Sequence, residues 1–131
     1  MDQSSLIQAA VRVRENAYAC YSGFAVGAAL LCEDGSVFTG CNVENLSSGL
    51  GMCAERVAVG AAVSAGKRAF RCIVIVSESD EVISPCGACR QVLAEFNPGL
   101  AVLAANLRGK TEQFSLEHLL PRAAKGILNR P

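Results

Sequence analysis

The sequence has few charged residues, 18% against about 25% in a typical domain, and contains a single histidine, His118. Twelve Lys and Arg residues balance twelve Asp and Glu residues, and no basic stretch exceeds two residues. This argues against nucleic acid as a substrate, because binding phosphates requires clustered Lys and Arg. A domain that is 51% apolar with so little charge is instead expected to hide surface against other subunits.

Long hydrophobic runs are also missing. No apolar stretch is long enough to cross a bilayer, and the first five residues lack the basic start and apolar run of a signal peptide. Seven dispersed cysteines, an odd number, indicate a reducing compartment, so we expect a cytoplasmic protein without membrane association. Four of them stand among apolar or small residues and are expected to be buried small hydrophobes: Cys20, Cys32, Cys41 and Cys72.

The 131 residues fit one domain, 1–131, with no repeat, linker or low-complexity segment. Hydrophobic periodicity predicts helices from a cap at Ser4 or Ser5 to near Ala19, and over about 52–65, 87–96 and 116–120. Strands are predicted over 24–32, 37–42, 71–77 and 100–106, with a short edge strand beginning at Phe114. An initial hairpin followed by alternating strands and helices predicts a mixed α/β sheet covered by helices.

Three cysteines and one glutamate lie in two short segments, each of which opens a predicted helix. Three thiolates, from Cys53, Cys86 and Cys89, can hold a tetrahedral Zn²⁺ and leave its fourth position for water. Helix N-termini favour thiolates, and Cys86 and Cys89 share one helical face. Zinc nucleobase deaminases carry a Cys/His-x-Glu and Pro-Cys-x-x-Cys pattern, which occurs here in its three-cysteine form. Since His118 is expected at the surface or an interface, the protein ligands must all be cysteine if the site is a catalytic zinc site.

Two residues beside Cys53 have expected roles in the chemistry. Glu55 is expected to carry protons from the water at the metal to N3 of cytosine and to the leaving amino group. The alternative is a carboxylate that only suits the helix N-terminus. Three thiolates leave a zinc site with one net negative charge, which Arg56 can offset by donating to a sulfur. An ordinary ion pair is the alternative for Arg56.

Four blocks occur in the order found in one family: Phe24-Ala-Val-Gly-Ala-Ala-Leu-Leu31, Gly40-Cys-Asn-Val-Glu-Asn45, Cys53-Ala-Glu-Arg56 and Pro85-Cys-Gly-Ala-Cys-Arg-Gln91. From about Tyr18 to Leu120 the chain resembles the small homotetrameric cytidine deaminases. The resemblance implies a three-layer α/β/α fold with a mixed five-stranded sheet. It also implies zinc-dependent hydrolytic deamination of cytidine and 2′-deoxycytidine to the uridines with release of ammonia, as in pyrimidine salvage.

The same resemblance implies how the nucleoside binds. Asn42 and Glu44 share one face of an extended segment and would bind the ribose, Phe24 would lie against the pyrimidine, and Ala54 would also contact the substrate. Zn²⁺ is the implied cofactor, and the implied assembly is a homotetramer whose active sites are shared between subunits.

The chain departs from the family pattern at several positions. Cys20 replaces a proline, Ser48 an aromatic residue and Gly51 a threonine, and the tail over 121–127 lacks the aromatic that stacks on the base from a neighbouring subunit. Either the affinity for cytidine is lower, or the natural ligand is larger, since stacking contributes on the order of 1–3 kcal/mol.

Three alternative functions stay open from the sequence. A deaminase of a modified cytosine nucleoside such as blasticidin S shares the zinc blocks. A structural zinc protein would need a fourth thiolate from Cys20 or Cys41, and would leave Glu55 without a task. A thioredoxin-like role for Cys86 and Cys89 would leave the third cysteine unexplained.

Overall fold

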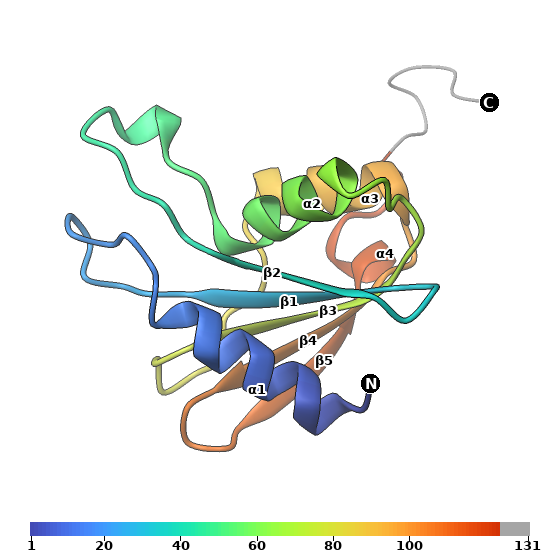
Figure 1. Cartoon of the computed structure of the whole chain (residues 1–131), viewed down its shortest axis with the longest axis horizontal. Coiled ribbons are helices and arrows are strands. Elements are labelled where there is room, and N and C mark those ends of the chain that lie inside the picture. The colour runs from blue at the N-terminus through green and yellow to red at the C-terminus, as the bar shows by residue number, and fades with distance from the viewer. Residues whose placement is uncertain (124–131) are drawn as a thin grey trace.

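The computed structural model describes residues 1–123. A five-stranded sheet with the order β2-β1-β3-β4-β5 forms its centre (Figure 1). Only β3 and β4 run parallel, and the other neighbours are antiparallel, so the predicted mixed sheet is confirmed. The strands are β1 (Gly27–Cys32), β2 (Val37–Cys41), β3 (Phe70–Ser77), β4 (Ala101–Asn106) and β5 (Thr111–Ser115).

Helices cover both faces of this sheet, giving the predicted three-layer α/β/α architecture (Figure 1). Helix α1 (Gln3–Arg14) packs on one face, while α2 (Ala54–Ser64), α3 (Gly87–Phe96) and the short α4 (Leu116–Leu119) lie on the other. A single 3₁₀ turn, η1 (Ser48–Leu50), interrupts the loop before α2. Within residues 1–123, no helix has the length and apolar character needed to cross a membrane.

The alternation of side chains along β3 divides the core into two clusters. Ile73 and Ile75 point toward α2 and α3, whereas Val74 and Val76 point toward α1, and all four are at most 1% exposed. A strand buried on both faces is expected to be apolar throughout, which explains the Cys-Ile-Val-Ile-Val run at 72–76. The strand thus anchors helices on both sides of the sheet.

Two glycines let helices approach the sheet directly. A Cβ at Gly40 in β2 would collide with the backbone carbonyl oxygen of Ala54 in α2. A Cβ at Gly27 in β1 would collide with the carbonyl oxygen of Ala10 in α1. Any side chain at either position would therefore push a helix off the sheet.

The first helix differs from its prediction at both ends. Its cap is Asp2, whose carboxylate accepts a hydrogen bond from the backbone N–H of Ser5 at 2.8 Å, and not Ser4 or Ser5. It ends at Arg14 and not near Ala19. The reason is long-range pairing: the N–H of Tyr18 donates to the carbonyl of Asn42 at 2.9 Å, which draws the chain out of the helix.

The first predicted strand also begins three residues late, at Gly27 and not at Phe24. The cysteine prediction is right for Cys32, which is buried, and wrong for Cys20, which is exposed in the turn after Tyr18. Cys41 and Cys72 are partly buried. The types of residue beside Cys20 in the sequence do not reveal that its turn projects away from the sheet.

Candidate active site

Three thiols from two helix N-termini converge on one point. Cys53 is the residue that caps α2, Cys86 caps α3, and Cys89 lies in the first turn of α3. Their Sγ atoms all lie within 4.8 Å of one another, and those of Cys53 and Cys86 are 3.8 Å apart. Two sulfurs bound to one tetrahedral zinc at about 2.3 Å each would be about 3.8 Å apart. The donor set and its spacing therefore fit zinc.

The fold explains this convergence. Helices α2 and α3 pack beside each other on the same face of the sheet, with their N-terminal ends adjacent (Figure 1). Pro85 is fully buried immediately before Cys86, and Cys89 is 0% exposed. Helix N-termini offer unpaired N–H groups and the positive end of the helix dipole, which stabilise thiolates.

The three thiols differ in acidity. Burial raises the pKa of Cys53 and, together with the nearby carboxyl of Glu55, that of Cys89. Burial also acts on Cys86, but hydrogen bonds from the backbone N–H groups of Cys89 and Ala88 help to outweigh it and lower the Cys86 pKa. A bound cation would favour the thiolate forms of Cys53 and Cys89 and so offset the effect of burial on their pKa values.

Arg56 lies against Cys53. Its Nη2 donates to the carbonyl oxygen of Gly51 at 3.2 Å and approaches Cys53 Sγ at 3.9 Å. This contact with Cys53 raises the pKa of Arg56. The Arg56 Nε is buried and has no hydrogen-bond partner among the described residues. A guanidinium with a spare donor thus lies beside the thiol cluster.

Glu55 is buried in the first turn of α2, with 4% of its surface exposed. Burial raises its pKa, while a hydrogen bond with the Cys89 thiol acts in the opposite direction. A buried carboxyl beside three thiols has few structural reasons to exist, because burying its charge costs free energy. Its position suits a group that takes up and returns protons.

Asn42 extends the pairing of β1 and β2 beyond their ends. Its Oδ1 accepts a hydrogen bond from the N–H of Val26 at 2.9 Å, and its Nδ2 donates to the carbonyl of Phe24 at 2.8 Å. The side-chain amide thus takes the place of a backbone peptide in a strand. This explains why β1 starts late and gives Asn42 a structural contact that the sequence did not predict.

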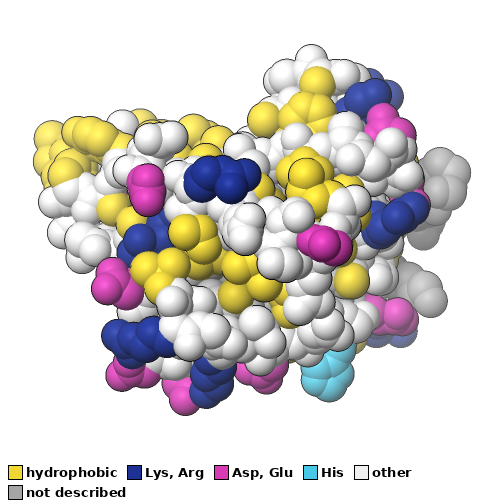
Figure 2. Space-filling view, turned by 60° about the horizontal axis from the view of Figure 1, so that its bottom comes forward, with side chains coloured by type: hydrophobic (Ala, Val, Ile, Leu, Met, Phe, Trp, Pro, Cys, Tyr) yellow, Lys and Arg dark blue, Asp and Glu magenta, His cyan; other side chains and the backbone are white. Residues whose placement is uncertain are grey.

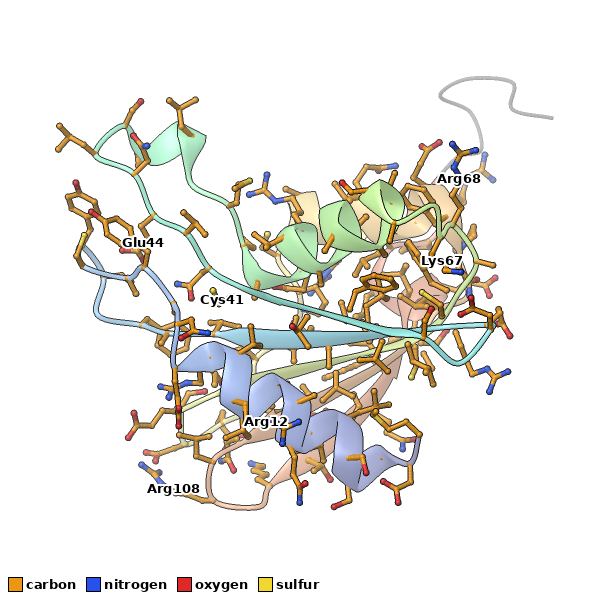
Figure 3. All side chains as sticks on the ribbon, viewed as in Figure 1. Arg12, Cys41, Glu44, Lys67, Arg68 and Arg108 are labelled. Carbon is orange, nitrogen blue, oxygen red and sulfur yellow. The ribbon has the colours of Figure 1, made fainter. Side chains whose placement is uncertain are left out.

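Glu44 binds the turn that follows Tyr18. One carboxylate oxygen accepts the N–H groups of Tyr21 and Ser22, both at 3.0 Å, and the other accepts the Ser22 hydroxyl. These bonds, that from the Ser22 hydroxyl first, lower the pKa of Glu44. Glu44 lies between the end of β2 and this turn (Figure 3). The structure therefore brings Asn42, Glu44 and Phe24 together, with Phe24 39% exposed.

The remaining predicted site residues fall in different surroundings. Ala54 is fully buried, so a substrate could reach only its backbone N–H at the start of α2. Cys20 and Cys41, the proposed fourth ligands of a structural site, lie outside the thiol cluster. His118 is exposed on α4. The tail positions from Ala124 onward, where the family aromatic is missing, lie outside the described residues.

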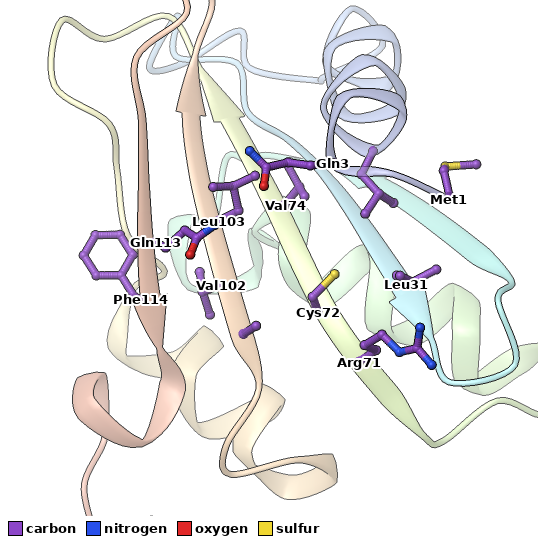
Figure 4. A pocket seen from close by; sticks show the side chains of 12 residues that line it. Met1, Gln3, Leu31, Arg71, Cys72, Val74, Val102, Leu103, Gln113 and Phe114 are labelled. Carbon is purple, nitrogen blue, oxygen red and sulfur yellow. The ribbon is translucent and has the colours of Figure 1, made fainter.

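A separate groove of about 330 Å³ lies beside α1, along β3, β4 and β5 (Figure 4). Leu31, Val74 and Leu103 are among its apolar lining residues, and Arg71 and Gln113 are among its polar ones. None of the predicted site residues lines this groove. The thiol cluster lies instead against the face that carries α2 and α3.

Comparison with known proteins gives a consistent result. Residues 1–105 match the family model described as the cytidine and deoxycytidylate deaminase zinc-binding region. A cytidine deaminase of Sporosarcina psychrophila is 48% identical over 124 residues, which cover 94% of this chain and 91% of that protein. A blasticidin-S deaminase of Bacillus cereus is 36% identical over 104 residues, covering 73% of this chain and 74% of that protein.

A solved structure shows the same fold. The crystal structure of cytidine deaminase from Burkholderia pseudomallei superposes with a TM-score of 0.90 at 51% sequence identity. The match covers 92% of this chain and 98% of that chain. The similarity therefore extends over the sheet, both helical layers and the two helix ends that carry the thiols.

Proposed function

Because the chain belongs to the cytidine and deoxycytidylate deaminase family, we propose that it deaminates cytidine and 2′-deoxycytidine hydrolytically. Water adds at C4 of the cytosine ring, the bond from C4 to the amino nitrogen breaks, and the products are the uridine and ammonia. We further propose that one domain, residues 1–131, carries the whole reaction, as its relatives match along most of their length.

The observation that carries this proposal is the group of three thiols beside a buried glutamate. Cys53, Cys86 and Cys89 would hold Zn²⁺, and their Sγ atoms lie within 4.8 Å of one another. Zinc, when bound, supplies the Lewis acidity that makes a water nucleophilic at neutral pH. We propose that Arg56 offsets the negative charge of the three thiolates from its place against Cys53.

Glu55 supplies the proton transfers. The reaction needs a base for the attacking water, a proton for N3 and a proton for the departing amino group. A single carboxyl can serve all three if it starts ionised and takes up a proton from the added water before each delivery, first to N3 and then to the amino group. Its burial keeps bulk water from competing for these protons and raises its pKa toward the range useful for exchange.

The part of the pocket that contacts the nucleoside would be formed by Asn42, Glu44 and Phe24. The N–H of Ala54 would be a further contact. The Phe24 ring would pack against the pyrimidine, because Phe24 is 39% exposed. Its backbone carbonyl accepts a hydrogen bond from Asn42 Nδ2, which fixes its position. The Glu44 oxygen that accepts the Ser22 hydroxyl has capacity for one more donor, such as a ribose hydroxyl. These residues would then both shape the turn and bind the sugar.

We propose that the protein assembles as a homotetramer with shared active sites. The two loops over 15–26 and 42–53 lie at one end of the molecule (left in Figure 1), and apolar side chains gather at the same end in the space-filling view (left in Figure 2). In the second of these apolar loops Leu46 is 85% exposed and Leu50 is 70% exposed. The outer side of α2 carries the exposed small residues Gly60 and Ala61. Apolar surface of this kind is typical of interfaces.

Seven free cysteines agree with a cytoplasmic location.

A deaminase of a modified cytosine nucleoside is the second candidate. The identity to the blasticidin-S deaminase of Bacillus cereus favours it, as do the missing tail aromatic and the serine at position 48. Such a substrate would need more room beyond the base than cytidine does.

The deciding experiment is a substrate panel on purified protein of known zinc content. Loss of the cytosine ultraviolet band is followed for cytidine, 2′-deoxycytidine, deoxycytidine monophosphate and blasticidin S. The proposal expects the highest kcat/KM with the plain nucleosides. A higher value for blasticidin S would select the second candidate, and no turnover of any of them by the zinc-loaded protein would refute both.

A further inference from the structure

Arg90 ties together three segments around the metal ligands. Its Nε donates to the carbonyl oxygen of Pro85 at 2.7 Å, and its Nη2 donates to Ser84 Oγ at 3.0 Å. Its Nη1 donates to the carbonyl oxygen of Leu119 at 3.0 Å, 29 residues further along the chain. A residue of α3 thus folds back onto the segment before the helix and also reaches the end of α4.

These contacts fix the backbone on both sides of Cys86. The Arg90 side chain holds the peptide between Pro85 and Cys86, while the Arg90 N–H donates to the carbonyl of Cys86 at 2.9 Å. Three thiols bind one zinc tightly only if their sulfurs are correctly placed, and supporting hydrogen bonds provide that placement. Cys86 is the exposed member of the cluster, so surrounding side chains restrict it less than they restrict Cys89.

The chemistry of the contacts requires arginine. All three acceptors are neutral oxygens on different residues, and each is bonded by a different guanidinium nitrogen of this partly buried side chain. A planar guanidinium presents five donors in a fixed fork and can satisfy all of them at once. A lysine ammonium carries the same charge on one nitrogen, so it cannot reach the acceptors on Ser84, Pro85 and Leu119 at the same time.

We propose that Arg90 is a positioning residue for the metal ligand Cys86: it orients the Ser84–Pro85 backbone and joins it to the C-terminal end of α4. Gln91 adds a second contact between α3 and the segment after α4, because its Nε2 donates to the carbonyl of Ala123 at 3.3 Å. The inference rests on the proposed zinc site and adds that its affinity depends on α4, which contributes no metal ligand.

The test measures zinc affinity by competition with a chromogenic chelator in wild type, Arg90→Gln and Arg90→Lys. Arg90→Gln should weaken zinc binding roughly 10- to 100-fold, the usual effect of losing a supporting contact, and Arg90→Lys should fall between it and wild type. Cobalt-loaded Arg90→Gln should also show an altered thiolate-to-cobalt charge-transfer band. Arg71→Gln, which removes an exposed arginine paired with Glu33, is the matched control and should leave both readouts unchanged.

Unfolding temperatures separate positioning from simple stabilisation. The unfolding temperature is measured with zinc and with a chelator that removes it. If Arg90 positions Cys86, Arg90→Gln should reduce the increase in unfolding temperature that zinc produces more than it reduces the unfolding temperature of the zinc-free protein. Equal losses with wild-type zinc affinity would overturn the inference. If Arg90→Gln does not fold, Ser84→Ala, which removes one of the three acceptors, must still weaken zinc binding, and wild-type affinity in that variant would also overturn it. A wild-type protein that binds no zinc would refute the proposed function itself.

Discussion

The Sγ atoms of Cys53 and Cys86 lie 3.8 Å apart, although 33 residues separate them in the sequence. Each cysteine caps a different helix, and both helices lie on the same face of the sheet. The chain thus builds a thiol cluster from two similar local structures, each a cysteine placed just before the first helical turn.

Zinc content provides the first prediction. The purified protein should hold one zinc per chain, and Cys53→Ser or Cys89→Ser should lose it, because two thiolates cannot complete the site. Elemental analysis and X-ray absorption check this, with three sulfurs and one lighter atom expected. Cys20→Ser, which alters an exposed thiol outside the cluster, is the control. A fourth sulfur on the metal would remove the catalytic interpretation.

Glu55→Gln should retain zinc and the fold, but its deamination rate should fall by roughly 10²- to 10⁴-fold or more, since the amide cannot carry protons. Steady-state kinetics on cytidine and elemental analysis of the same sample measure both properties. The substitution also removes a buried carboxylate, so no loss of thermal stability is expected. Turnover at an appreciable fraction of the wild-type rate would show that another group moves the protons.

The turn held by Glu44 should respond to acid. Hydrogen bonds from the hydroxyl and N–H of Ser22 and from the N–H of Tyr21 lower the Glu44 pKa from its ordinary 4.5. A carboxyl with a lowered folded-state pKa contributes its full stabilisation above pH 4.5 and loses it as the pH falls through the folded value. The amide resonances of Tyr21 and Ser22 should therefore titrate with a midpoint below 4.5. This transition should be absent in Glu44→Gln, and a midpoint above the ordinary value would contradict the role.

Asn42→Asp should raise the KM for cytidine by roughly 2- to 10-fold, as expected for the loss of one hydrogen bond of about 0.5–1.5 kcal/mol. Aspartate keeps the oxygen that accepts the Val26 N–H but loses the Nδ2 donor to the Phe24 carbonyl. Asn45→Asp is the matched control, because within residues 1–123 the Asn45 side chain bonds through its Oδ1, which accepts the Ser47 N–H and which aspartate retains. Equal KM values in wild type and Asn42→Asp would mean that this contact does not position Phe24.

Assembly can be tested on the outer side of α2. Static light scattering at micromolar concentration should give four times the chain mass of 13.7 kDa. Gly60→Glu should reduce this mass without unfolding the chain, since a Cβ there meets no atom within 4 Å and glutamate favours a helix more than glycine does. Gln113→Glu, on an exposed position of β5, should stay tetrameric. A monomeric wild type would refute the assembly.

Much of the fold could be predicted from local patterns. The apolar run at 72–76 and the helix over 87–96 were predicted closely, because each combines a clear periodicity with clear end signals. The end of α1 was missed, because a hydrogen bond between Tyr18 and Asn42 ends the helix. Pairing across 24 residues leaves no signal in the helix sequence itself.

The candidate site shows the same division. The Cys-x-Glu and Cys-x-x-Cys spacing predicted which thiols converge, and the structure brings them together. The backbone contacts of Asn42 and Glu44 were not predicted, because a polar residue at a strand end can face a ligand or a neighbouring turn equally well. Arg90 could not be assigned either, since its acceptor on Leu119 lies in a different helix.

The two loops that we propose line the nucleoside pocket are attached to the framework differently from the thiols and Glu55. The two apolar loops meet each other and the metal segment through the isolated bridges Tyr18–Val43 and Val43–Met52 and through the side chains of Asn42 and Glu44. The thiols, in contrast, sit on helices packed against the sheet. If the proposed roles hold, substitutions in the loops can change substrate preference without displacing the groups proposed to react. A lineage can exchange residues in these loops to admit a bulkier nucleoside while the reacting groups stay in place, and loop grafting between relatives offers the same route to a deaminase of altered specificity.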